Sequence, residues 1–146
     1  SFWDYIYLGP NRVGLHNSVA NRYAKMENGN MFGSVPAGPT FPNGWTWEAF
    51  EVKREPLNNG DVVAFWSPWY KRFLRLHSNG IADRSDEWDG EGLRADWGWE
   101  RFTIVDVGNG DIAIHSPIHN KFLRMNSNGH IDSCCTMGVN EFPTGW

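Results

Sequence analysis

Apolar and polar positions alternate over short stretches of this chain, and turn-forming residues interrupt them often. At 63–66 the alternation places Val63 and Phe65 on one side and Trp66 on the other, which is the period of a β-strand. Ser-Asn-Gly follows at 78–80 and again at 127–129, and it favours tight hairpins because Asn and Gly tolerate a positive φ. Gly and Pro interrupt most candidate helical windows, and no ten-residue window shows a clear helical period. The pattern predicts short strands joined by tight turns.

The same pattern occurs three times along the chain, at intervals of about 50 residues. The first motif of each repeat aligns as VGLHNSVANRYAKMENGN from Val13, VAFWSPWYKRFLRLHSNG from Val63 and IAIHSPIHNKFLRMNSNG from Ile112. The second motif reads WEAFEV from Trp47, WERFTIV from Trp99 and, at the start of the chain, WDYIYL from Trp3. We therefore expect the opening strand to complete the third repeat. The repeats would span about 13–60, about 61–110, and about 111–146 plus 1–12.

Four short strands in each repeat give twelve antiparallel strands with local connections. A closed barrel leaves no unpaired sheet edge exposed, whereas an open sheet would. We expect one all-β domain over 1–146, a circularly permuted β-trefoil with a six-stranded barrel capped by three hairpins. A three-repeat solenoid is the less favoured alternative, because the split repeat requires the two ends of the chain to meet.

The repeated motifs W-E-x-F-x-(I/V), G-x-(V/I)-A-(F/I) and (R/K)-F-L-R-(L/M)-x-S-N-G extend over the whole chain. In these motifs the chain resembles the fascin-like β-trefoil domains, and it is also similar to the trefoils of fibroblast growth factors and amaranthin-type lectins. The resemblance implies a fold more than a function, since one fold hosts unrelated activities. Among fascin-like proteins, the best-known members bundle actin. The Q-x-W repeat of ricin-type lectins does not occur, so no sugar-site residues carry over from that family.

Composition narrows the classes of function. The 146 residues carry a net charge of −4, which argues against a uniformly basic surface for nucleic acid or anionic lipid. No apolar run is long enough to span a bilayer. Ser1 in place of an initiator Met indicates a processed or excised chain. Because Cys134 and Cys135 are adjacent, a disulfide between them cannot cross-link distant segments, and we expect two free thiols. The two cysteines do not indicate a cellular compartment, and we favour a secreted protein slightly over a cytoplasmic one.

Catalytic and metal-binding motifs are absent from the sequence, so we expect neither an enzyme nor a cofactor. It has no zinc-ligand spacing, no G-x-S-x-G and no phosphate loop. His115 and His119 are four residues apart but flank a Ser-Pro turn, so we do not expect them to share a metal. Asp86, Glu87 and Asp89 offer oxygens for calcium, yet their spacing matches no calcium loop and is typical of a solvated loop.

Aromatic residues are numerous, with 9 Trp, 9 Phe and 4 Tyr, and they divide into two groups. We expect the recurring Trp3, Trp47 and Trp99 to lie in the core with Ile6, Phe50 and Phe102. The other rings lie beside turns, where an aromatic face could stack on a sugar while neighbouring polar groups bind its hydroxyls. The alternatives are that these rings pack under loops or contact a protein partner.

An Arg and an Asp eight residues apart flank the same hairpin turn in repeats two and three. Pairing across the hairpin would bring each Arg to its Asp, as a surface ion pair or as a fixed couple for sugar hydroxyls. Repeat one has Lys25 and Gly33 at these places. The candidate ligand-binding residues are Trp66, Trp69, Tyr70, Arg75 and Asp83 in repeat two, and His115, His119, Asn120, Arg124 and Asp132 in repeat three.

These features predict a non-enzymatic, lectin-like carbohydrate-binding module with up to three pseudo-equivalent shallow sites, whose partners are glycans or glycoconjugates. The first alternative is a fascin-like protein that binds actin or another filament, which the basic doublets Lys53-Arg54 and Lys71-Arg72 support weakly. The second is a structural subunit that binds a protein partner, or self-associates, through exposed Trp side chains.

Overall fold

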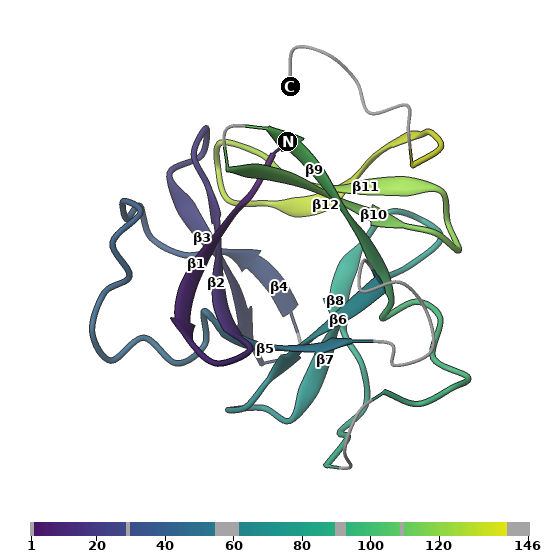
Figure 1. Ribbon diagram of the computed structural model, residues 1–146, viewed down its shortest axis with the longest axis horizontal. Helices are drawn as coiled ribbons and strands as arrows, with labels where there is room; N and C mark the ends of the chain where they lie inside the picture. Colours follow the sequence, from purple (N-terminus) through teal and green to yellow (C-terminus); the bar gives the residue numbers. More distant parts are fainter. Residues whose placement is uncertain (1, 29, 55–61, 90–92, 109, 140–146) are drawn as a thin grey trace.

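Twelve β-strands make up the fold in the computed structural model, which describes residues 2–28, 30–54, 62–89, 93–108 and 110–139. No helix occurs in these ranges. The strands are arranged around a common centre (Figure 1). In chain order they are β1 (Asp4–Gly9), β2 (Arg12–Asn17), β3 (Arg22–Glu27), β4 (Asn30–Gly33), β5 (Ala49–Arg54), β6 (Val62–Ser67), β7 (Arg72–Leu76), β8 (Ala82–Arg84), β9 (Phe102–Gly108), β10 (Asp111–Ser116), β11 (Lys121–Met125) and β12 (Ile131–Thr136).

Hydrogen bonding closes seven of these strands into an antiparallel barrel. The pairing runs β2-β3-β4-β8-β7-β6-β5 and returns to β2, and the other five strands lie outside this ring. The predicted β-trefoil, with six barrel strands and three capping hairpins, is therefore wrong. The prediction fails at the pairing of β4 with β8, in which Asn30 is opposite Asp83. This pairing makes the β3–β4 and β7–β8 hairpins part of the ring.

Three equivalent hairpins reproduce the sequence repeat in the structure. They are β3–β4, β7–β8 and β11–β12, and single bridges from His130 and Asp132 tie the third hairpin to Phe32 and to Ile81. The predicted turns are present, because Gly80 and Gly129 adopt φ values of 91° and 92°. Such values favour glycine, which has no Cβ to clash with the backbone.

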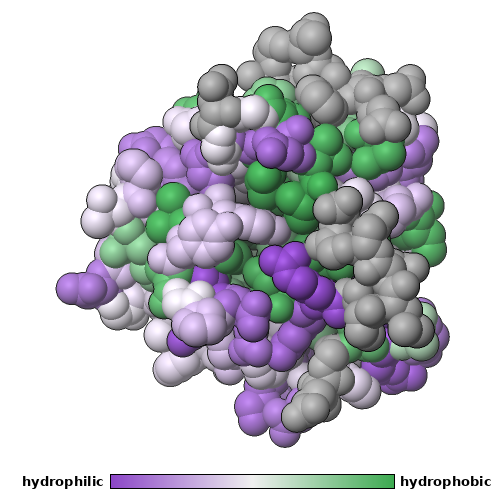
Figure 2. All heavy atoms as spheres, in the orientation of Figure 1, coloured by the Kyte–Doolittle hydropathy of each residue, from purple (hydrophilic) through white to green (hydrophobic). Residues whose placement is uncertain are grey.

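The core consists of apolar side chains from all three repeats, Trp3, Phe50, Phe65 and Phe102 among them. Trp47 and Trp99 are only half-buried, so our placement of these two residues in the core is wrong. They precede β5 and β9 and therefore stand at the margin of the sheet. On the face in Figure 2, apolar side chains reach the surface near the middle, and hydrophilic ones predominate towards the left and lower edges.

Strand β1, at one end of the sheet order, links β2 to β10. It pairs with β2 along its length, and Trp3 bridges to Ile112 of β10. The Trp3 indole N–H donates to the carbonyl oxygen of Leu123 at 3.2 Å. β1 thus lies between β2 and β10, much as β5 lies between β2 and β6.

Asp4 on β1 is expected to make stability fall as the pH rises. Burial, the hydrogen bond with Asp111 and repulsion from it raise the pKa of Asp4 from 3.8 to about 6. A raised folded-state pKa contributes stability below pH 4 that is lost as the pH rises through 6. We expect Asp4→Asn, whose amide can still bond Asp111, to raise the melting temperature at pH 7.5 more than at pH 4.5.

The reciprocal Asp111→Asn variant should behave in the same way, because it removes the other half of the repulsion. Thermal denaturation followed by circular dichroism at the two pH values measures both variants. An equal change in melting temperature at both pH values would contradict this account.

Two further properties complete the fold. Cys134 is disulfide-bonded, so the expectation of a free thiol at this position is wrong. Over the described ranges, the protein has no helix capable of crossing a lipid bilayer.

Candidate functional site

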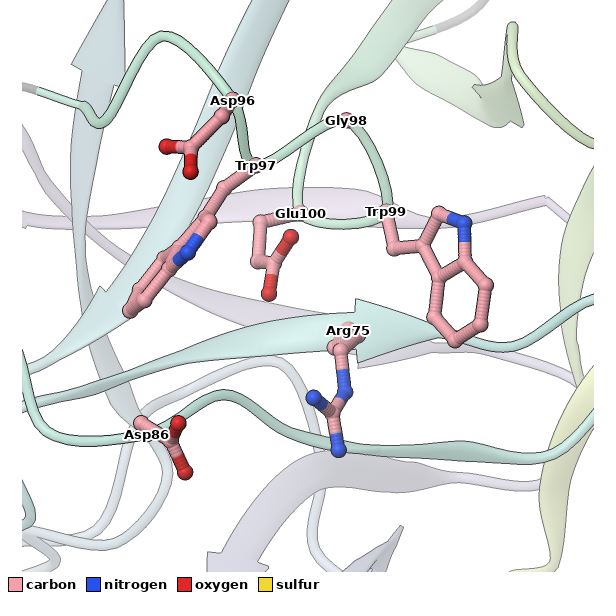
Figure 3. A pocket seen from close by; sticks show the side chains of 7 residues that line it. All are labelled: Arg75, Asp86, Asp96, Trp97, Gly98, Trp99 and Glu100. Atoms are coloured by element: carbon pink, nitrogen blue, oxygen red, sulfur yellow. The ribbon is translucent and has the colours of Figure 1, made fainter.

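A pocket of about 220 Å³ opens between β7 and the segment that leads into β9 (Figure 3). Two indoles, Trp97 and Trp99, stand at its sides, and the Glu100 carboxylate lies between them in this view. The segment is held by Leu76, whose amide donates to the Trp99 carbonyl at 3.1 Å. A turn, closed by the Arg101 amide donating to the Gly98 carbonyl, places Glu100 beside β7. The remaining polar lining comes from Arg75, Asp86 and Asp96.

The Arg75 guanidinium is fixed by Asp83 across the β7–β8 hairpin. Its Nε and Nη2 donate to Oδ1 and Oδ2 of Asp83, both at 2.9 Å, and His77 Nε2 lies 2.8 Å from Oδ2. Burial alone would raise the pKa of Asp83, but the hydrogen bonds from Arg75 and His77 outweigh it and lower that pKa. The couple is bidentate and partly buried, which distinguishes it from a loose surface pair.

Glu100 is the most buried charged group of the pocket, with 4% of its surface exposed. This burial raises the pKa of Glu100. The positive charge of Arg75 and a hydrogen bond from the backbone amide of Glu100 to its carboxylate act in the opposite direction. Within the described ranges, no side chain donates a hydrogen bond to this carboxylate. A buried anion of this kind is costly unless something pairs with it.

The pocket indoles are held by neighbouring rings. Trp97 contacts Phe73 and Trp88 at centroid distances of 6.3 and 5.9 Å. Trp99 contacts His77 at 4.9 Å and His119 at 5.1 Å. Since His119 belongs to repeat three, two repeats contribute to this site.

A second pocket, of about 310 Å³, occupies the matching place in repeat one. Its lining includes Lys25 in the place of Arg75, with Trp45, Trp47 and Glu48 in the places of Trp97, Trp99 and Glu100. The supports match as well, because the Met26 amide donates to the Trp47 carbonyl at 3.0 Å.

The rings around this second pocket are also equivalent. Tyr23 contacts Trp45 at 6.2 Å, and Tyr70 of repeat two contacts Trp47 at 6.0 Å. Glu48 is 7% exposed, and burial raises its pKa. The sequence W-x-W-E thus builds the same pocket twice.

The third repeat contributes only part of this arrangement to the described structure. Trp3 and Asp4 align with Trp99 and Glu100. Arg124 donates from Nε and Nη2 to Asp132, both at 2.9 Å. The closing FPTGW motif aligns with the tryptophan segment of the other pockets but falls at 142–146, outside the described residues.

The candidates that we named in repeat two are distributed over two sites. Arg75 lines the pocket of its own repeat, and Asp83 orients it, whereas Tyr70 borders the pocket of repeat one. Trp69 is 61% exposed and lines a smaller hollow beside Thr46. Trp66 is half-buried, and its indole N–H donates to the Trp88 carbonyl at 3.0 Å.

The candidates in repeat three do not form one site either. His119 Nε2 lies 2.8 Å from the Leu76 carbonyl and so supports the repeat-two pocket. His115 is buried with Nε2 at 2.9 Å from the Met137 carbonyl, and Asn120 occupies a turn at a φ of 56°. Arg124 and Asp132 pair with one another, as predicted from the hairpin.

Sequence reasoning missed the tryptophan–glutamate segment itself. We assigned Trp47 and Trp99 to the core because they recur, and did not consider Glu48 and Glu100. The available signal was the repeated acid, since a strand that entered the core directly would have no reason to place Glu at that position twice.

Two acids of the loop at 86–89 lie against basic side chains. Glu87 lies 3.8 Å from Arg72, and Asp89 lies 3.4 Å from Lys71. Throughout the ranges described, no group of three or more His, Cys, Asp or Glu residues converges as metal ligands would.

Comparisons with known proteins add no relative to this picture. No protein-family model matches the chain, and no curated protein matches it significantly. The resemblance to fascin-like domains therefore stays a prediction.

Proposed function

We propose that this protein is a non-enzymatic carbohydrate-binding module whose sugars bind in the two W-x-W-E pockets. The observation that carries the proposal is the duplication of one constellation in two repeats. Each copy has a pair of indoles, a buried Glu and a cation anchored by an acid.

This constellation suits a sugar because it offers both kinds of contact that a sugar ring needs. An indole face packs on the C–H face of a pyranose, while carboxylate and guanidinium groups bind its hydroxyls. At about 220 Å³, the repeat-two pocket is smaller than the roughly 300–1,000 Å³ of drug-sized ligand sites. Its size fits one sugar unit of a longer glycan.

Because the chain has two shallow pockets, we expect tight binding to come from occupying both pockets at once and not from a high affinity at either one. Each would bind weakly, and a glycan or surface that engages both would be held more tightly through effective concentration. We therefore expect the binding to depend on the valency of the ligand.

Removing one indole from each pocket is expected to weaken this binding. We predict that Trp45→Ala combined with Trp97→Ala lowers the apparent affinity for a multivalent glycan at least tenfold, because both pockets lose a stacking face. A glycan array with the tagged, clustered protein identifies the ligand, and titration calorimetry measures the loss. Tyr7→Ala, which removes an exposed ring on β1 outside both pockets, is the matched control.

A second candidate is a protein-interaction subunit, and one observation favours it. The matching turns of the three repeats each expose an apolar side chain, namely Val19, Trp69 and Ile118. Failure of the clustered protein to bind any glycan, together with self-association in sedimentation, would support this candidate over the lectin. Filament binding is less favoured, since Lys53 pairs with Glu51, and Lys71 and Arg72 lie against acids of the neighbouring loop.

A further inference from the structure

Each of the two pockets contains a buried carboxylate whose neighbouring cation is bound to a different acid. In repeat two, Arg75 lies beside Glu100, but its guanidinium is bidentate to Asp83. In repeat one, Lys25 is close enough to affect Glu48, but its ammonium lies 3.0 Å from Glu27. The same unbalanced charge therefore arises in both repeats from different residues.

The surroundings of Glu100 add further negative charge. Asp86 and Asp96 also line the pocket, and among the described residues Asp96, unlike Asp86, forms an ion pair with an arginine, Arg94, at 3.0 Å. Counting Arg75 against Asp83 and Arg94 against Asp96 leaves the charges of Glu100 and Asp86, of which Arg101 offsets part at Glu100. Leaving a buried carboxylate without a counter-charge is unfavourable, so a ligand that brings a cation gains from pairing with it.

The walls of the pocket favour the same kind of ligand. Trp97 and Trp99 stand on either side of Glu100 in Figure 3. Indole is the best of the aromatic side chains at attracting a cation to its face, and the attraction is strongest where water is excluded. The Arg94 guanidinium already lies over Trp97, 5.0 Å from the ring centroid. A small cationic group that enters the pocket would therefore meet the Trp99 indole and the Glu100 carboxylate.

From this geometry we infer that the W-x-W-E pockets select a protonated amine, and that their ligand is an amino sugar with a free ammonium group, such as a β-linked glucosamine oligomer. The inference rests on the proposed function and specifies its ligand. The indoles would pack on the pyranose ring, and Glu100 or Glu48 would accept hydrogen bonds from the ammonium group. An N-acetylated or neutral sugar of the same shape lacks the charge that these carboxylates leave uncompensated.

The test compares three trisaccharides of one shape, β1,4-linked glucosamine, N-acetylglucosamine and glucose, by titration calorimetry at pH 6. We expect the glucosamine oligomer to bind at least tenfold more tightly than either of the others. Combining Glu48→Gln with Glu100→Gln should reduce this preference to within about twofold, because the amide keeps the shape and hydrogen-bonding capacity but loses the charge. Glu51→Gln, an acid on β5 outside both pockets, should leave the preference unchanged.

The outcomes separate this inference from the proposed function. Equal binding of all three sugars would overturn the inference and leave the carbohydrate function standing. A preference that persists in the double Gln variant would also overturn it. Binding of a trimethyllysine peptide but of no sugar would overturn both, and so would binding of none of the probes. Circular dichroism of each variant shows that it is folded.

Discussion

Replacing Trp3 with alanine is expected to destabilise the protein by about 3–5 kcal/mol. The indole has no exposed surface, it packs in the core, and its N–H satisfies the Leu123 carbonyl. The substitution opens a cavity and leaves that carbonyl without its donor. The free energy of unfolding of a domain is only about 5–15 kcal/mol, so this loss is a large part of it.

Urea denaturation followed by fluorescence and circular dichroism measures this effect. Trp69→Ala is the matched control, since the same change removes an indole that is 61% exposed and should cost less than about 0.5 kcal/mol. Equal losses in the two variants would mean that Trp3 does not tie β1 to the third repeat. Denaturation in two separate steps in the Trp3 variant would show instead that the barrel survives without β1.

Gly33→Ala is expected to cost about 1–3 kcal/mol or more, although it adds a single methyl group. A Cβ at Gly33 would lie 2.8 Å from the Cα of Gly129, which is backbone and cannot move aside as a side chain can. The Gly33 amide also donates to the Gly129 carbonyl at this contact. The methyl group would therefore push apart the hairpins of repeats one and three.

Gly38→Ala provides the comparison for this prediction. A Cβ at Gly38 would meet no atom within 4 Å. The change should therefore be neutral or slightly stabilising, because alanine restricts the unfolded chain more than glycine does. If the two variants unfold at the same urea concentration, the hairpins are not in tight contact at Gly33.

Local features of this fold could be predicted from the sequence, and pairings between distant segments could not. The turns at Gly80 and Gly129 depend on φ preferences of the residues in the turn, and the Arg75–Asp83 pairing follows from the length of the hairpin between them. The barrel closes through one pair, Asn30↔Asp83. No periodicity within a strand indicates which other strand it will pair with.

The candidate site was predictable to the same extent. Arg75 and Asp83 were found because both belong to one hairpin. The positions of Trp99 and Glu100 depend on how the segment before β9 lies against β7. A hydrogen bond from the Leu76 amide to the Trp99 carbonyl holds the two together. Recurrence of a tryptophan indicates a shared environment, but it does not reveal whether that environment is the core or the wall of a pocket.

Each pocket is bordered by a side chain from the following repeat, Tyr70 on Trp47 and His119 on Trp99. One repeat alone therefore holds a recognition site with one flank missing. The affinity for a ligand therefore depends on the packing of one repeat against the next. A fragment that ends at residue 110 would keep every residue that lines the repeat-two pocket, but it would lack His119 and would bind the ligand more weakly. Duplicating a repeat unit could then create a new function only once a neighbour was present to complete it.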